Sequence, residues 1–125
     1  MTYVPKLYNT QVLEKLPFPT KECFELVVVA EINYFEVDNN YCTLFRLNGT
    51  SLLIIKSLND VMKMLPHKTF YRTHDKYIVN GNQCHKYFKK DFQILMENGV
   101  TLKVAERKDP GFIAFLCKIK SKPGK

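Results

Sequence analysis

The stretch Phe70-Tyr-Arg-Thr-His-Asp-Lys-Tyr-Ile-Val-Asn80 interleaves basic and aromatic side chains and ends in a short apolar run. In an extended chain alternate side chains point to the same face, so Arg72, His74 and Lys76 would share a face and could meet a polyanion together. The polar outer face of an ordinary strand has the same pattern. The stretch therefore indicates β structure, and the rest of the chain must decide between these two interpretations.

Outside this stretch, most of the chain has the pattern of short strands divided by turns. Asn48-Gly49 and Asn98-Gly99 are dipeptides preferred in two-residue hairpin loops, and Asp38-Asn39-Asn40 is a further turn. The pattern predicts strands at residues 24–29, 32–37, 41–47, 51–55, 70–73, 77–79, 84–88, 92–96 and 101–104. The sequence thus predicts a mostly β domain.

Two segments depart from the strand pattern. Ser57 is a favourable N-cap, and apolar residues follow it at helical spacing up to Pro66, which predicts one short helix of about two turns. The apolar run Phe112–Cys117 follows Pro110-Gly111 and is either a strand or a second short helix, because six apolar residues do not decide between them.

The length of 125 residues fits one domain, and the apolar fraction of 46% argues against disorder. We expect an extended lead-in over residues 1–16, the domain over 17–117 and a basic tail over 118–125. No apolar run approaches the roughly 20 residues of a membrane span, and the start lacks the pattern of a secretion signal. A cytoplasmic protein without a membrane partner is therefore expected.

Charge is concentrated in one central block. The net charge is +7, and residues 63–90 carry seven Lys and Arg against one Asp. The cations of this block are interleaved with aromatic residues, as expected of a folded surface that faces a polyanion. The tail, with four Lys, is more often a solvated chain end. Basic charge alone does not separate nucleic acid from acidic lipid.

Catalytic and metal-binding patterns are missing from the sequence. It has no glycine-rich phosphate loop and no nucleophile elbow, and its three His are dispersed. Its four Cys do not have zinc-site spacing, and we expect all of them to be buried or half-buried apolar residues: Cys23, Cys42, Cys84 and Cys117. The sequence therefore predicts no enzyme, no cofactor and no metal site.

Several motifs taken in order resemble the LytTR DNA-binding domain of LytR/AlgR/AgrA-type bacterial transcription regulators. They are Glu31-Ile-Asn-Tyr-Phe-Glu36 with Asn39-Asn-Tyr41, then Ser57-Leu58, then Phe70-x-Arg-x-His74 with Tyr77-Ile-Val-Asn80, and finally Leu95-x-x-Asn-Gly99 with Leu102-x-Val104. The resemblance covers about residues 17 to 116. Its most specific part is the F-x-R-x-H run with the I-V-N that follows.

The resemblance implies a fold of about ten short strands in small antiparallel sheets with one or two short helices. It also implies sequence-selective binding of double-stranded DNA in transcription regulation and two-component signalling, with loops in successive major grooves. The contacting loops would be residues 38–42, 74–76 and 105–108. Partners implied are paired direct repeats in DNA, a second copy of the chain, and a separate receiver or sensor protein.

Carried onto this sequence, the DNA-binding residues would be Asn39, Asn40, Tyr41, Cys42, His74, Asp75, Lys76, Arg107 and Lys108. Arg107 would contact guanine or phosphate, the two asparagines adenine, and Lys76 and Lys108 phosphate. The loop-positioning residues would be Arg72, Asn80 and Ser57, and His74 would also help to hold its loop.

The sequence departs from the family pattern at Asp75, where many members carry Arg or Asn, and at Ala105-Glu106, where a Ser-Arg pair is usual. Phosphate repels a carboxylate, so these departures leave open a protein-interaction module of the same fold with reduced DNA specificity. The interleaved aromatics leave open a single-stranded nucleic-acid binder. Base choice cannot be copied from the family.

Overall fold

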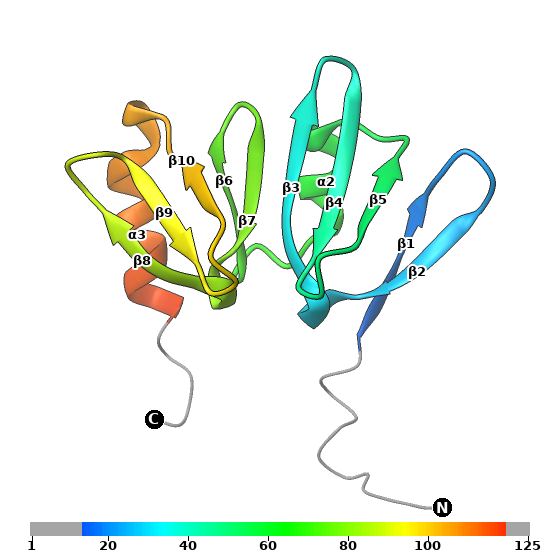
Figure 1. Ribbon diagram of the computed structural model, residues 1–125, viewed down its shortest axis with the longest axis horizontal. Helices are drawn as coiled ribbons and strands as arrows, with labels where there is room; N and C mark the ends of the chain where they lie inside the picture. The colour runs from blue at the N-terminus through cyan, green and yellow to red at the C-terminus, as the bar shows by residue number, and fades with distance from the viewer. Residues whose placement is uncertain (1–13, 120–125) are drawn as a thin grey trace, which may run out of the picture.

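The computed structural model describes residues 14–119, which form ten strands and two α-helices (Figure 1). A two-stranded sheet pairs β1 (Lys15–Pro19) with β2 (Phe24–Val28). A five-stranded sheet has the order β5-β4-β3-β7-β6, made of β3 (Ile32–Asp38), β4 (Tyr41–Arg46), β5 (Ser51–Ile54), β6 (Phe70–His74) and β7 (Tyr77–Asn80). A three-stranded sheet has the order β10-β9-β8, made of β8 (Cys84–Phe88), β9 (Gln93–Met96) and β10 (Thr101–Lys103). The helices are α2 (Leu58–Met64) and α3 (Asp109–Ile119).

All strand pairs are antiparallel, and the predicted mostly β fold is confirmed. Both predicted hairpin glycines have left-handed backbone, with φ of 90° at Gly49 and 95° at Gly99, a region that glycine enters without steric cost. The predicted helix is α2, and the Ser57 hydroxyl accepts from the Asp60 amide at 3.1 Å as its N-cap. Local sequence signals thus account for these elements.

Two elements differ from expectation. Strand β1 is not among the predicted strands, and its Pro17 and Pro19 are residues that central strands exclude; β1 pairs with β2 alone, and prolines are tolerated on such edge strands. The closing segment is the eleven-residue helix α3, which begins at Asp109 and places Pro110 in its first turn, where a missing amide donor costs nothing. Most of the predicted lead-in and tail lies outside the described residues, which include only residues 14–16 and 118–119 of them.

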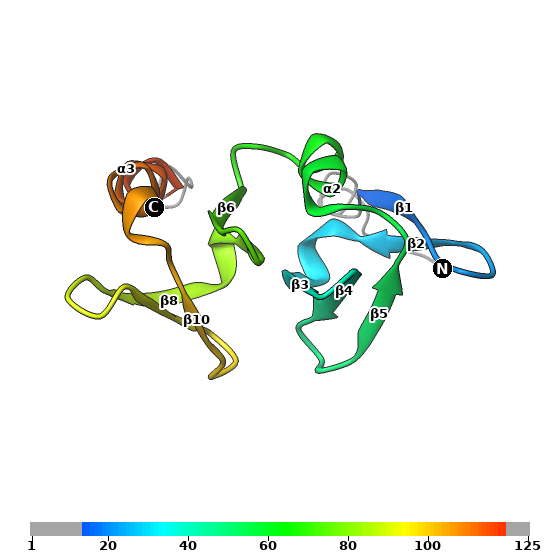
Figure 2. The same cartoon turned by 90° about the horizontal axis from the view of Figure 1, so that it is seen from above.

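The five-stranded sheet is packed on both faces. Neighbouring residues alternate between two apolar clusters: Phe35 and Ile78 belong to one, and Tyr34 and Val79 to the other. Because successive side chains of a strand point to opposite faces, the clusters lie on opposite sides of the sheet. One core lies under α2 and the β1–β2 hairpin, the other under α3 and β8–β10, and in Figure 2 the two helices lie apart. Strands β3 and β7 therefore support both halves.

The four cysteines fall into two groups. Cys42 is buried and Cys84 half-buried, as expected, but Cys23 and Cys117 are exposed, so the expectation is wrong for these two. Cys23 lies in the β1–β2 turn and Cys117 on the solvent side of α3. Burial raises the pKa of the Cys42 thiol to about 11 and that of Cys84 to about 12.

This difference predicts the alkylation pattern of the native protein. Near neutral pH iodoacetamide should modify Cys23 and Cys117, whereas Cys42 and Cys84 should react only after unfolding, because they are shielded and hold little thiolate. Intact mass should show two adducts on the folded chain and four in denaturant. Rapid addition of a third adduct to the folded chain would contradict the burial of these thiols.

Candidate nucleic-acid interface

Three loops that are distant in sequence meet at one edge of the molecule. The β3–β4 turn, the β6–β7 turn and the segment that joins β10 to α3 all lie along the upper edge in Figure 1. Backbone hydrogen bonds connect them: the Val37 amide donates to the Lys76 carbonyl at 2.9 Å, and the Ala105 amide donates to the Thr73 carbonyl at 2.8 Å. The fold thus brings the three predicted contact regions side by side.

The β3–β4 turn presents exposed polar side chains. Asn39 has a φ of 58°, which asparagine adopts more readily than most residues, and both it and Asn40 are exposed. Tyr41 is 60% exposed at the start of β4. Cys42 corrects the predicted list: its side chain is 2% exposed and packs in the core, because inward and outward positions alternate along β4. Its thiol is not exposed at the edge where the three loops meet.

The β6–β7 turn is held by Arg72. Its guanidinium donates to the His74 carbonyl at 3.1 Å, to the Asp75 carbonyl at 2.7 Å and to Asn59 Oδ1 at 2.7 Å. His74 Nδ1 accepts from the Lys76 amide at 3.1 Å, so this ring nitrogen serves the turn itself. Arg72 is therefore a positioning residue, and the side chains of Asp75 and Lys76 are left exposed at the tip.

The two other predicted positioning residues make their side-chain hydrogen bonds away from the turn. Asn80 is 3% exposed at the far end of β7; its Nδ2 donates to the Ile32 carbonyl at 2.8 Å and its Oδ1 accepts from the Asn82 amide at 3.0 Å. Ser57 caps α2, the helix that carries Asn59. No sequence pattern points to Asn59 as a functional residue, because its partner Arg72 lies 13 residues away on another element.

The third loop forms a 3-10 turn, Glu106–Lys108, directly before α3. In it Arg107 Nη2 donates to Asp75 Oδ1 at 2.7 Å, with side chains 62% and 76% exposed. This hydrogen bond and the charge of Arg107 lower the pKa of the Asp75 carboxyl. The Tyr87 hydroxyl donates to Asp109 at the start of α3, and burial with this bond raises the pKa of Tyr87. The predicted guanine-reading arginine is thus paired with the acid that departs from the family pattern.

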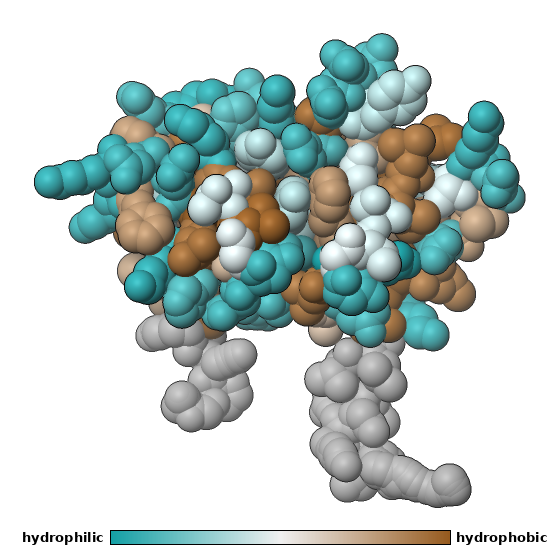
Figure 3. Space-filling view, in the orientation of Figure 1, coloured by the Kyte–Doolittle hydropathy of each residue, from teal (hydrophilic) through white to brown (hydrophobic). Residues whose placement is uncertain are grey.

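The edge also carries lysines. Lys76 is exposed and Lys108 half-exposed, and the exposed residues Lys89 and Lys90 lie in the β8–β9 turn at the upper left of Figure 1. Sequence reasoning placed Lys89 and Lys90 in the basic block but did not name them as contacts. In Figure 3 the upper left rim is largely hydrophilic, whereas apolar patches lie lower and to the right.

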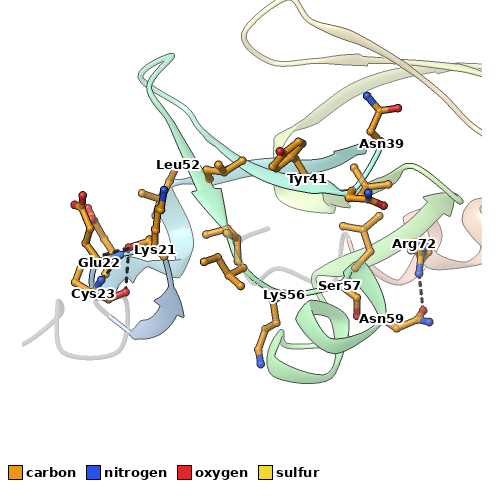
Figure 4. Close-up of a pocket in the computed structure, with 18 residues that line it drawn as sticks. Lys21, Glu22, Cys23, Asn39, Tyr41, Leu52, Lys56, Ser57, Asn59 and Arg72 are labelled. Atoms are coloured by element: carbon orange, nitrogen blue, oxygen red, sulfur yellow. Dashed lines mark hydrogen bonds between the residues drawn. The ribbon is translucent and has the colours of Figure 1, made fainter.

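An open groove of about 1070 Å³ adjoins this edge. Its walls come from the β1–β2 turn, the β3–β4 turn, strand β5 and the start of α2 (Figure 4). Tyr41 and Leu52 lie along one side, and Lys56 and Arg72 lie near α2. Over residues 14–119 no group of three or more His, Cys, Asp or Glu is placed to hold a metal ion. No helix in the same span is long and apolar enough to cross a membrane.

The family model of the LytTr DNA-binding domain matches residues 22–116 of this chain. The chain belongs to the LytTR family. A solved LytTr DNA-binding domain, from a Bacillus cereus protein described as a methyl-accepting/DNA response regulator, superposes with a TM-score of 0.71 at 22% identity, over 82% of this chain and 96% of that one. The comparison with curated proteins found no match. The matched span of this LytTR domain contains all three loops of the edge.

Proposed function

We propose that this LytTR domain binds double-stranded DNA sequence-selectively in bacterial transcription regulation, with its three loops in successive major grooves. Membership of a DNA-binding domain family supports a DNA partner. The observation that carries the proposal is the meeting of the three loops at one edge, joined by the Val37–Lys76 and Thr73–Ala105 backbone bonds. A major groove about 12 Å wide admits such strand-borne loops.

The roles of the side chains follow from their chemistry. Arg107 offers a planar fork of donors to guanine O6 and N7, and the amides of Asn39 and Asn40 can pair with adenine N6 and N7. Lys76 and Lys108 are placed for phosphate, which fixes the orientation without reading sequence. Arg72 holds the β6–β7 turn, whereas Asn80 stabilises the far end of β7 and Ser57 the start of α2. We further propose that the domain binds DNA in the cytoplasm and that it neither uses a cofactor nor catalyses a reaction.

The partners proposed are a spaced direct repeat in DNA, a second copy of the chain on the neighbouring repeat, and a separate receiver or sensor protein that delivers the signal. Selection from a random duplex library with the purified chain, at two salt concentrations, tests the DNA part. Enrichment of a spaced direct repeat, with affinity that falls as salt rises, is the expected result. Retention without enrichment would leave electrostatic affinity alone and would contradict sequence selectivity.

Binding of single strands is tested in the same experiment by competition with unpaired oligonucleotides. Base stacking needs exposed aromatic rings. Among the aromatics of the basic block Phe70 is 1% exposed and three tyrosines pack on the second core (Tyr71, Tyr77 and Tyr87), so within this block Phe88, at 44% exposed, is the one ring that is open for stacking. Preference for duplex is therefore expected. Stronger binding to single strands would favour the stacking alternative.

A protein-interaction module is the second candidate function, and one observation favours it. Large apolar side chains are exposed on β2 and on or directly after β5: Phe24, Leu26, Leu53 and Ile55. Leu53 and Ile55 line the groove that adjoins the β3–β4 turn. The same library experiment separates the candidates, because a module that has lost DNA specificity would enrich no sequence.

A further inference from the structure

The ion pair between Asp75 and Arg107 joins two loops that are 32 residues apart in the chain. The two partners are held at short range by the backbone, because the Ala105 amide donates to the Thr73 carbonyl two residues before each of them. Arg72 fixes the Asp75 carbonyl from the other side at 2.7 Å. The carboxylate is therefore presented to Arg107 by a turn whose geometry is already set.

Pairing changes what the guanidinium can bind. An arginine has five N–H donors in a rigid fork, and the bond to Asp75 uses one of them, so a pair of donors remains for a base edge. However, the charges of the pair cancel, so the pair neutralises little phosphate charge and releases few counterions from DNA. The carboxylate in addition repels phosphate. An unpaired arginine, in contrast, keeps its full positive charge and binds any phosphate within its reach.

We propose that Asp75 is a specificity-determining residue: through its ion pair with Arg107 it directs that guanidinium to a guanine edge and away from the phosphate backbone. This inference rests on the proposed function. Asp75 departs from the family pattern, and on this inference the departure increases discrimination between bases instead of only lowering affinity for DNA. Asp75 acts through Arg107 and need not touch DNA.

The test uses Asp75→Asn, which keeps the shape and a neutral acceptor for Arg107 but removes the charge. Dissociation constants are measured for the selected repeat, for its single-base variants and for random duplex at two salt concentrations. The base pair contacted by Arg107 is identified as the one at which Arg107→Ala no longer discriminates between the selected base and the other bases. We expect Asp75→Asn to bind random duplex more tightly, to steepen the salt slope by about one unit, and to lose about tenfold discrimination at that base pair.

The matched control is Asp91→Asn, because Asp91 is also exposed, lies in the β8–β9 turn and has no ion pair among residues 14–119. It should raise affinity for all sequences alike and leave discrimination unchanged. If Asp75→Asn behaves like Asp91→Asn, or if Arg107→Ala loses discrimination at no position, the inference is overturned. If the wild-type chain enriches no duplex sequence, the proposed function itself fails, and the inference falls with it.

Discussion

Replacing Arg107 with Ala is expected to cost about 1–3 kcal/mol of binding free energy at one base pair of the selected repeat. The Arg107 side chain is 62% exposed at the edge where the three loops meet, and its guanidinium carries the donor fork that matches guanine. Part of the loss should be shared by all sequences, because the substitution leaves the Asp75 carboxylate unpaired near phosphate. Titration of every single-base variant of the repeat measures both parts.

Lys108→Ala and Lys76→Ala are the matched controls for this prediction. Each should weaken binding to all sequences by the same factor and reduce the salt slope by about one unit, as expected of a phosphate contact. The base-specific part of the Arg107→Ala loss is the difference between the selected repeat and its single-base variants, and it is measured with Asp75 present. If Arg107→Ala weakens binding to all sequences alike, as the lysine variants do, Arg107 does not read a base.

Replacing Phe112 with Ala is expected to lower the free energy of unfolding by about 3–5 kcal/mol. Phe112 is fully buried on α3, and its ring centroid lies 5.8 Å from that of Tyr71, 5.0 Å from that of Tyr87 and 6.0 Å from that of Phe115. Truncation would leave a cavity in the second core. Urea unfolding followed by circular dichroism measures the loss.

Phe24→Ala is the control for Phe112→Ala, because it makes the same chemical change at a side chain that is 70% exposed. It should change stability by less than about 0.5 kcal/mol. Because α3 directly follows the loop of Arg107, the Phe112 variant should also bind the selected repeat more weakly while still folded. Equal effects of the two substitutions would contradict the role given to the second core.

The parts of the fold that were predictable from sequence depend on local chemistry. The hairpin turns need a glycine with positive φ, and the start of α2 needs an N-cap. Gly49 and Gly99 therefore predict the turns, and Ser57 predicts the start of the helix. The parts that were missed depend on context. The prolines of β1 are tolerated only because that strand is an edge. Pro110 lies within the first turn of α3 instead of preceding the helix, because the amides of a first helical turn need no intrahelical acceptor.

The edge where the three loops meet likewise combines features that could be predicted from sequence with features that could not. The exposed loops could be located from turn residues and the family resemblance, but the contacts between them could not. The Arg107–Asp75 pair spans 32 residues and the Arg72–Asn59 bond 13, and no periodicity links such partners. Cys42 was expected both to be buried, as a small apolar residue, and to lie in a contact loop; the register of β4 decides for burial, because a one-residue change along a strand turns a side chain from solvent to core.

The double-sided packing of β3 and β7 has a consequence for assembly during translation. The first core draws on residues from Leu16 to Ile78, whereas the second needs residues as late as Phe115. A nascent chain that has emerged through Ile78 therefore holds every residue of one core but lacks the loop of Arg107. Since chains are synthesised from the N-terminus, the surface that would bind DNA is completed only after every residue of the first core has emerged.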